Sequence, residues 1–122
     1  MNDQKKFGVW MDNHHATVIG KTSAEQEFTV LAHVNNETST ENSSEKNEHQ
    51  HEKALKLKFF KTITSHMQNA EVVHVTGTGQ AQEQFIHHLA ETPQFKNTKT
   101  SECTSNKMSD ERLLEFLGEK LK

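Results

Sequence analysis

Two glycines separated by one residue follow a short apolar segment, and this spacing is suited to binding an anion. Gly77 and Gly79 flank Thr78, and helical periodicity begins at Gln80. Such a turn leaves backbone N–H groups free at the start of a helix, where they can donate hydrogen bonds to phosphate oxygens. The Lys-Ser/Thr pair of a P-loop and the third glycine of a dinucleotide-binding motif are both missing. We therefore expect the turn mainly to pack a strand against a helix, with anion binding by residues 77–80 as the alternative.

Lysine side chains are concentrated in the segment that begins at residue 53, and they could contact RNA phosphates. The four candidates are Lys53, Lys56, Lys58 and Lys61. A solvated helix face is the simpler interpretation, because charged residues ordinarily cover the exposed side of an amphipathic helix. The net charge of the chain is −3, which argues against broad affinity for nucleic acid.

A metal-dependent nuclease would need several carboxylates close together, because two-metal hydrolysis requires oxygen ligands for a pair of cations. Asp12, near the end of the first apolar segment, is the best-placed acid, whereas residues 72–76 contain none and Glu71 precedes them. A role for Asp12 in a turn is the simpler expectation. We expect no catalytic residues, and a ribonuclease H-like hydrolase that uses Asp12 is the alternative.

The nine histidines of the chain have spacings that do not favour a dedicated metal site. The conspicuous pairs are His14-His15, His49-x-His51 and His87-His88. A metal site needs rigidly held ligands at suitable spacing, whereas two pairs are adjacent residues and the third lies in a polar segment. His74, inside an apolar segment, is expected to be a hydrogen-bonded core residue. No metal, cofactor or small-molecule substrate is expected.

Cys103 is the only cysteine, so the chain cannot form an internal disulfide. Its surroundings in the sequence are polar and contain no evident base, so a nucleophilic role is not expected. Residues 1–6 lack the apolar core of a signal peptide, and no apolar run approaches the ~20 residues that span a bilayer. These observations predict a cytoplasmic protein without a membrane partner.

The first third of the chain is predicted to form three antiparallel strands. Alternating apolar residues indicate strands over 7–12 and 16–20, joined by a polar turn. A third strand over 28–34 is expected to place four apolar side chains on one face. These are Phe28, Val30, Ala32 and Val34. Residues 35–52 contain no large apolar side chain and are predicted to be a disordered loop.

Helices alternate with strands in the rest of the chain. An apolar residue at every fourth position predicts an amphipathic helix over 53–69. Residues 72–76 are predicted to be a strand inside the sheet, followed by a helix that starts at the glycine turn and stops at Pro93. A polar edge strand over 99–104 and a last helix capped by Ser109 complete the pattern.

The resulting order is β-β-β-loop-α-β-α-β-α, which predicts a single α/β domain over residues 1–122 with a mixed, ribonuclease H-like sheet. Several short motifs in this order resemble the bacterial translational machinery protein group. They are Gly8-Val9-Trp10-Met11-Asp12, Ala16-Thr17-Val18-Ile19, Phe59-Phe60, Val75-Thr76-Gly77-Thr78-Gly79-Gln80-Ala81 and Lys107-Met108-Ser109-Asp110. That group is similar to the central domain of eukaryotic and archaeal peptide-chain release factors and of pelota.

The resemblance implies a translation-associated module whose partner is the ribosome, ribosomal RNA or a translation factor. Release factors carry Gly-Gly-Gln between the third strand and the first long helix, but residues 35–52 contain no glycine, which argues against peptide release. Family members commonly have Gly-Pro-Gly followed by a small residue and Lys at this turn. Here the segment reads Gly77-Thr78-Gly79-Gln80-Ala81-Gln82, so both glycines are present but the Pro and the Lys are missing. A protein-interaction domain unrelated to ribosomes is a further alternative.

Overall fold

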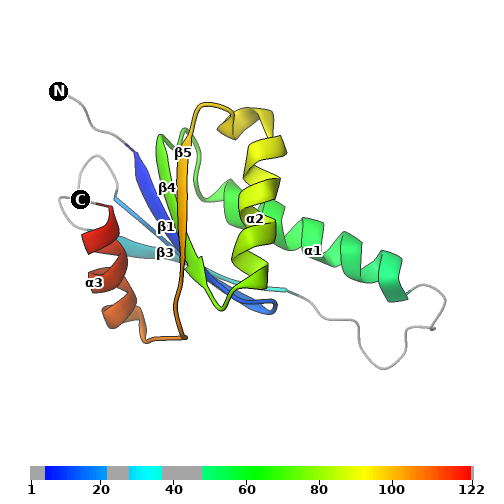
Figure 1. The fold of residues 1–122 in the computed structure, drawn as a ribbon, viewed down its shortest axis with the longest axis horizontal. Helices are drawn as coiled ribbons and strands as arrows, with labels where there is room; N and C mark the ends of the chain where they lie inside the picture. Colours follow the sequence, from blue (N-terminus) through cyan, green and yellow to red (C-terminus); the bar gives the residue numbers. More distant parts are fainter. Residues whose placement is uncertain (1–4, 22–27, 37–47, 122) are drawn as a thin grey trace.

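The computed structural model describes residues 5–21, 28–36 and 48–121, and the side chains of the first long helix from Ala54 onward (Figure 1). Five strands form one mixed sheet in the order β3-β2-β1-β4-β5. The strands are β1 (Lys6–Met11), β2 (His15–Gly20), β3 (Thr29–Asn35), β4 (Val72–Gly77) and β5 (Lys99–Thr104). The helices are α1 (Glu48–Ser65), α2 (Gln80–Glu91), a short 3-10 helix η2 (Pro93–Phe95) and α3 (Asp110–Lys120). The predicted mixed α/β architecture is confirmed.

Helices cover both faces of the sheet. In Figure 1, α1 and α2 lie on one side and α3 on the other. The alternation predicted for the first strand is confirmed, because Phe7, Val9 and Met11 pack in the cluster that also holds the α1 and α2 side chains, and Trp10 packs in the α3 cluster. β4 lies inside the sheet between β1 and β5, parallel to both, as the sequence predicted.

A β-bulge in β3 corrects the prediction that its apolar residues share one face. Val18 pairs with Ala32 and Ile19 with Val30, so Leu31 is an extra residue in β3. One inserted residue moves the side chains beyond it to the other face. Val30 therefore packs with α3, whereas Val34 packs toward α1.

The predicted ends of the loop over 35–52 and of the helix over 53–69 were wrong. Asn35 belongs to β3, and Glu48–Glu52 form the first turns of α1, because Glu and Gln are good helix formers even without an apolar stripe. Residues 37–47, the rest of the predicted disordered loop, lie outside the described residues. At its other end α1 stops at Ser65 rather than 69, where Thr64 and Ser65 hydroxyls bond to nearby backbone carbonyls.

The last helix is capped at its start and tied to β1 at its end. Ser109 is the predicted N-cap, and its hydroxyl accepts a 3.3 Å hydrogen bond from the backbone N–H of Arg112. At the other end, Lys6 Nζ donates to the Leu121 carbonyl at 2.9 Å. None of the described helices is long and apolar enough to cross a bilayer.

Candidate functional site

The glycine turn has a packing reason at each glycine. A Cβ on Gly77 would overlap the backbone carbonyl oxygen of Met11, so β4 can lie this close to β1 only with glycine there. Gly79 is the N-cap of α2 and has φ 137°, a conformation that only glycine adopts easily. Close strand-helix packing, the simpler of the two interpretations, therefore accounts for both residues.

The side chain of Gln82, directly after the turn, ties the start of α2 to β5. Its Nε2 donates to the Cys103 carbonyl at 2.6 Å, which turns Oε1 toward Gly77. Within the described part of the chain, this buried oxygen has no hydrogen-bond partner.

Asp12 is engaged in the turn between β1 and β2. Its Oδ1 accepts hydrogen bonds from the backbone N–H groups of His14 and His15, at 2.8 and 2.7 Å. Partial burial alone would raise the pKa of Asp12, but these two bonds and the neighbouring imidazoles lower the pKa below its ordinary value. Asp12 is thus the turn residue that the simpler interpretation predicted.

His74 is the hydrogen-bonded core residue that the sequence predicted. The sequence predicted no base beside Cys103, but the imidazole of His74 lies next to its sulfur. His74 Nδ1 lies 2.7 Å from Ser101 Oγ, and its Nε2 lies 3.2 Å from Cys103 Sγ. The thiol donates to Thr76 Oγ1 at 3.2 Å, and Thr76 bonds Ser105 at 2.7 Å. Both ring nitrogens of His74 therefore lie within hydrogen-bond distance of a side chain of β5.

Histidine pairs do not assemble with other ligands in the structure. No group of three or more His, Cys, Asp or Glu side chains suited to a metal ion occurs among the described residues. His88 packs instead against Phe60, with ring centroids 5.3 Å apart. The side chains of His49 and His51 lie outside the described part of α1.

The predicted lysine cluster is divided by the fold. Lys58 and Lys61 lie on the outer side of α1, whereas Lys56 points toward α2 and donates to Gln84 Oε1 at 2.7 Å. The side chain of Lys53 lies outside the described part of α1. Of the three candidates whose side chains are described, two are therefore placed together on an open surface.

We call this open surface the outer face of α1. It is a shallow hollow of about 510 Å³ lined by Ala54, Leu57, Lys58, Lys61, Thr62 and Ser65. Leu57, with 46% of its surface exposed, is the one large hydrophobic residue found exposed in the described part of the chain. Residues 54–69 contain no acidic residue, and neither lysine pairs with an acid among the described side chains. The outer face of α1 is thus positively charged although the chain is net negative.

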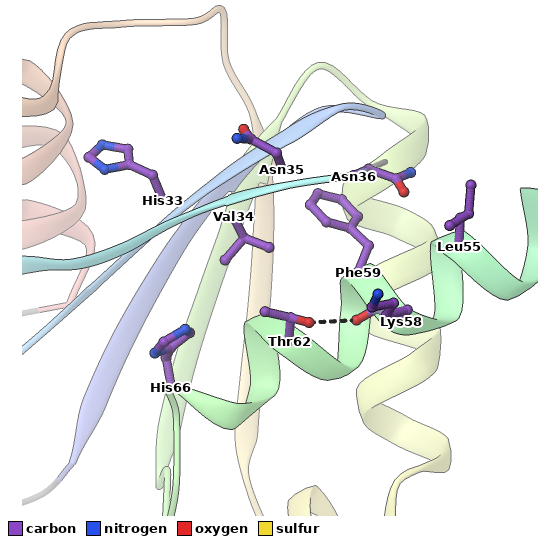
Figure 2. Close-up of a pocket in the computed structure, with 9 residues that line it drawn as sticks. All are labelled: His33, Val34, Asn35, Asn36, Leu55, Lys58, Phe59, Thr62 and His66. Atoms are coloured by element: carbon purple, nitrogen blue, oxygen red, sulfur yellow. Dashed lines mark hydrogen bonds between the residues drawn. The ribbon is translucent and has the colours of Figure 1, made fainter. Parts of the chain in front are cut away.

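A second hollow, of about 280 Å³, lies between β3 and α1 (Figure 2). We call it the edge groove, and it is lined by His33, Val34, Asn35, Asn36, Leu55, Lys58, Phe59, Thr62 and His66. Lys58 and Thr62 line both hollows. Sequence reasoning missed the edge groove because β3 and α1 are separated in the sequence and meet only in the folded chain; the unusual density of His and Asn at the end of β3 was the one available signal.

The fold is similar to that of translation factors of known structure. Against Pelota from Thermoplasma acidophilum the TM-score is 0.63 at 19% identity, covering 97% of this chain and 34% of that one. Against Pelota from Archaeoglobus fulgidus it is 0.62 at 13% identity, covering 98% and 32%. An archaeal translation termination factor gives 0.55 at 14% identity, covering 95% and 34%. The sequence-based resemblance to the pelota and release-factor fold is confirmed.

These similarities concern one part of larger proteins. The chain spans about one third of the length of the Pelota and termination-factor chains that it matches. No protein-family model matches the sequence, and no curated protein matches it either. At these identities the comparisons establish the fold.

Proposed function

We propose that this chain is a non-enzymatic, translation-associated module of the ribonuclease H-like fold class that binds the ribosome, or a factor bound to it, in the cytoplasm. The fold similarity to Pelota and an archaeal termination factor supports the connection with translation. The observation that carries the proposal is the outer face of α1, where Lys58 and Lys61 flank exposed Leu57 and no acidic residue lines the face among the described side chains. Ribosomal RNA offers the phosphates that such a surface would bind.

The position of α1 in the chain supports the same proposal. It follows the segment that corresponds to the Gly-Gly-Gln segment of release factors, and this chain has no glycine between Gly20 and Gly77. The proposed module therefore binds without releasing peptide. Two lysines make a small electrostatic contribution, because each neutralised phosphate adds only about 0.7 to 0.9 to the slope of log affinity against log salt. We therefore propose specific docking at one site rather than general RNA affinity.

Sucrose-gradient fractionation of cells tests the association with ribosomes. The protein is followed by immunoblotting in growing, starved and stressed cells, at low and at high salt. We expect it in ribosomal fractions in at least one condition, with release at high salt because the contacts are partly ionic. Absence from those fractions in all three conditions would overturn the proposal.

Crosslinking distinguishes RNA contacts from contacts with a bound factor. A photoreactive amino acid is introduced at Leu57, inside the outer face of α1, and in a control protein at Thr100 on the opposite edge of the molecule. We expect ribosomal RNA, or a ribosome-bound protein, to be crosslinked from position 57 only. Equal crosslinking from both positions would indicate that the outer face of α1 is not the docking surface.

A further inference from the structure

The outer edge of β3 is open, and its backbone pattern shows which residues could pair with another strand. Asn36 N–H donates to the His14 carbonyl at 2.8 Å, on the side of β2. In an antiparallel pair, hydrogen-bonded and non-hydrogen-bonded residues alternate along the strand. The backbone N–H and C=O groups of Asn35 and His33 therefore point away from β2, where β3 has no neighbour in the described sheet. An open edge of this kind can accept an added strand.

The edge groove runs beside these open backbone groups. Figure 2 shows Val34 pointing toward α1, and His33 and Asn35 on the other side of the strand. Leu55, Val34 and Phe59 give the groove an apolar part, and Lys58, Thr62 and His66 give it a polar part. A peptide strand presents side chains alternately to two faces, so every second residue would enter the groove.

The buried side chain of Asn36 ties one end of the edge groove to the turn between β1 and β2. The Oδ1 atom of Asn36 is buried and has no hydrogen-bond partner in the described part of the chain, while its Nδ2 donates to the Asn13 carbonyl at 3.1 Å. A buried acceptor without a partner costs free energy.

The charges of the edge groove select the kind of peptide. Lys58 carries a positive charge and pairs with no acid among the described residues, and the imidazole of His66 adds a second polar group. Among the described residues, the carboxylate of Asp110 lies on the α3 side of this edge, 2.9 Å from His33 Nε2. Acidic side chains would therefore be attracted on the α1 side of an added strand.

We propose that the edge groove binds an extended, acidic-apolar peptide segment of another protein as a sixth strand beside β3. The peptide backbone pairs with His33 and Asn35, an apolar side chain contacts Leu55 and Phe59, and a carboxylate approaches Lys58. The opposite edge, β5, exposes polar side chains along most of its length, so a strand added there would bury little apolar surface. This proposal stands apart from ribosome binding, because residues specific to each hollow separate the two.

Titration with a designed peptide tests the proposal by NMR. The probe is the capped heptapeptide Thr-Glu-Thr-Val-Thr-Glu-Thr, whose two glutamates and valine share one face of an extended strand, added to the isotopically labelled full chain. We expect saturable shifts at the amides of His33 and Asn35 and in α1, with a dissociation constant between about 10 µM and 1 mM. No shifts at these amides up to millimolar peptide, or shifts at β5 instead, would overturn the proposal.

Matched peptides and variants test the charge and the strand pairing. Replacing both glutamates of the peptide by lysine, or making Lys58→Glu, is expected to weaken binding by about fivefold to tenfold, whereas Lys61→Glu, outside the edge groove, changes it by less than about twofold. Methylating the peptide backbone nitrogens at one set of alternate residues abolishes binding, and methylating the other set does not, because only one set faces β3. Equal effects of the two sets would overturn strand addition.

A competing RNA ligand would give a different result. If a single-stranded RNA oligonucleotide shifts the His33 and Asn35 amides and displaces the peptide, the edge groove belongs to the RNA surface and the peptide proposal is wrong. Loss of ribosome association in Lys61→Glu with unchanged peptide binding would support the peptide proposal, because it would show that the edge groove binds peptide independently of the outer face of α1. Conversely, loss of peptide binding in His66→Glu with normal ribosome association would separate the two hollows.

Discussion

The Nε2 atom of His74 lies 3.2 Å from the sulfur of Cys103, although 29 residues separate them in the sequence. Both belong to a line of polar side chains that crosses the β4–β5 pair on the α3 side and also includes Ser101 and Thr76. His74 and Thr76 are buried, so this line satisfies polar groups inside the protein. Its role is structural, because it ties the polar edge strand β5 to the sheet.

Replacing Cys103 tests the contribution of this line to stability. Cys103→Val removes the partner of both His74 and Thr76 and is expected to lower the free energy of unfolding by about 1 to 2 kcal/mol. Cys103→Ser keeps a donor and an acceptor and should cost clearly less. Urea denaturation at pH 8 measures both. A Cys103→Val protein as stable as wild type would show that the line of hydrogen bonds contributes nothing.

The stability of the fold should decrease on mild acidification because of two histidines. Burial lowers the pKa of His74 below its ordinary value of 6.5, and the positive charge of Lys120 lowers it further. Burial also lowers the pKa of His88; Glu91 opposes this effect and Lys61 adds to it. The unfolded chain therefore binds more protons than the folded one near pH 6.5, so stability is full above that pH and falls as the pH decreases below it.

Thermal denaturation between pH 8 and pH 5 measures this dependence. We expect the midpoint to fall most steeply just below pH 6.5, and the double variant His74→Gln/His88→Gln to show a shallower decrease. His87→Gln, whose side chain is exposed, is the control and should retain the wild-type slope. A pH profile that the double substitution leaves unchanged would contradict the assignment to these residues.

Three glycine-to-alanine substitutions should differ in sign and size. Gly77→Ala places a methyl group against the Met11 carbonyl and is expected to destabilise by about 1 to 3 kcal/mol or more. Gly79→Ala has open space but φ 137°, and is expected to cost about 1 to 3 kcal/mol through backbone strain. Gly118→Ala lies within α3 with only an ordinary contact to Phe28, and should stabilise by up to about 1 kcal/mol. A neutral Gly77→Ala would contradict the close approach of β1 and β4.

Local sequence patterns predicted the element types well, because the apolar alternation of β1 and the spacing in α1 and α2 follow directly from strand and helix geometry. They failed where the pattern is carried by polar residues. The first turns of α1 contain no apolar stripe that would distinguish them from a loop, and the extra residue Leu31 leaves the composition of β3 looking like a regular strand.

The candidate surfaces were harder to predict than the fold. The His74–Cys103 contact depends on the β4–β5 register, and the edge groove depends on how α1 packs beside β3. Neither relationship is local in the sequence. The lysines were correctly noticed, but their helical positions alone did not show that Lys56 turns toward Gln84 while Lys58 and Lys61 share the outer face of α1.

Binding of the purified protein to purified ribosomes tests the central claim most directly. Pelleting through a sucrose cushion compares wild type with Lys58→Glu/Lys61→Glu, and with Lys96→Glu/Lys99→Glu, a charge-matched control at exposed positions away from α1. We predict that the first double variant binds at least about tenfold more weakly, since each unpaired cation is replaced by a repelling charge, and that the control binds like wild type. Equal binding of all three proteins, or equal loss in both variants, would contradict docking through the outer face of α1.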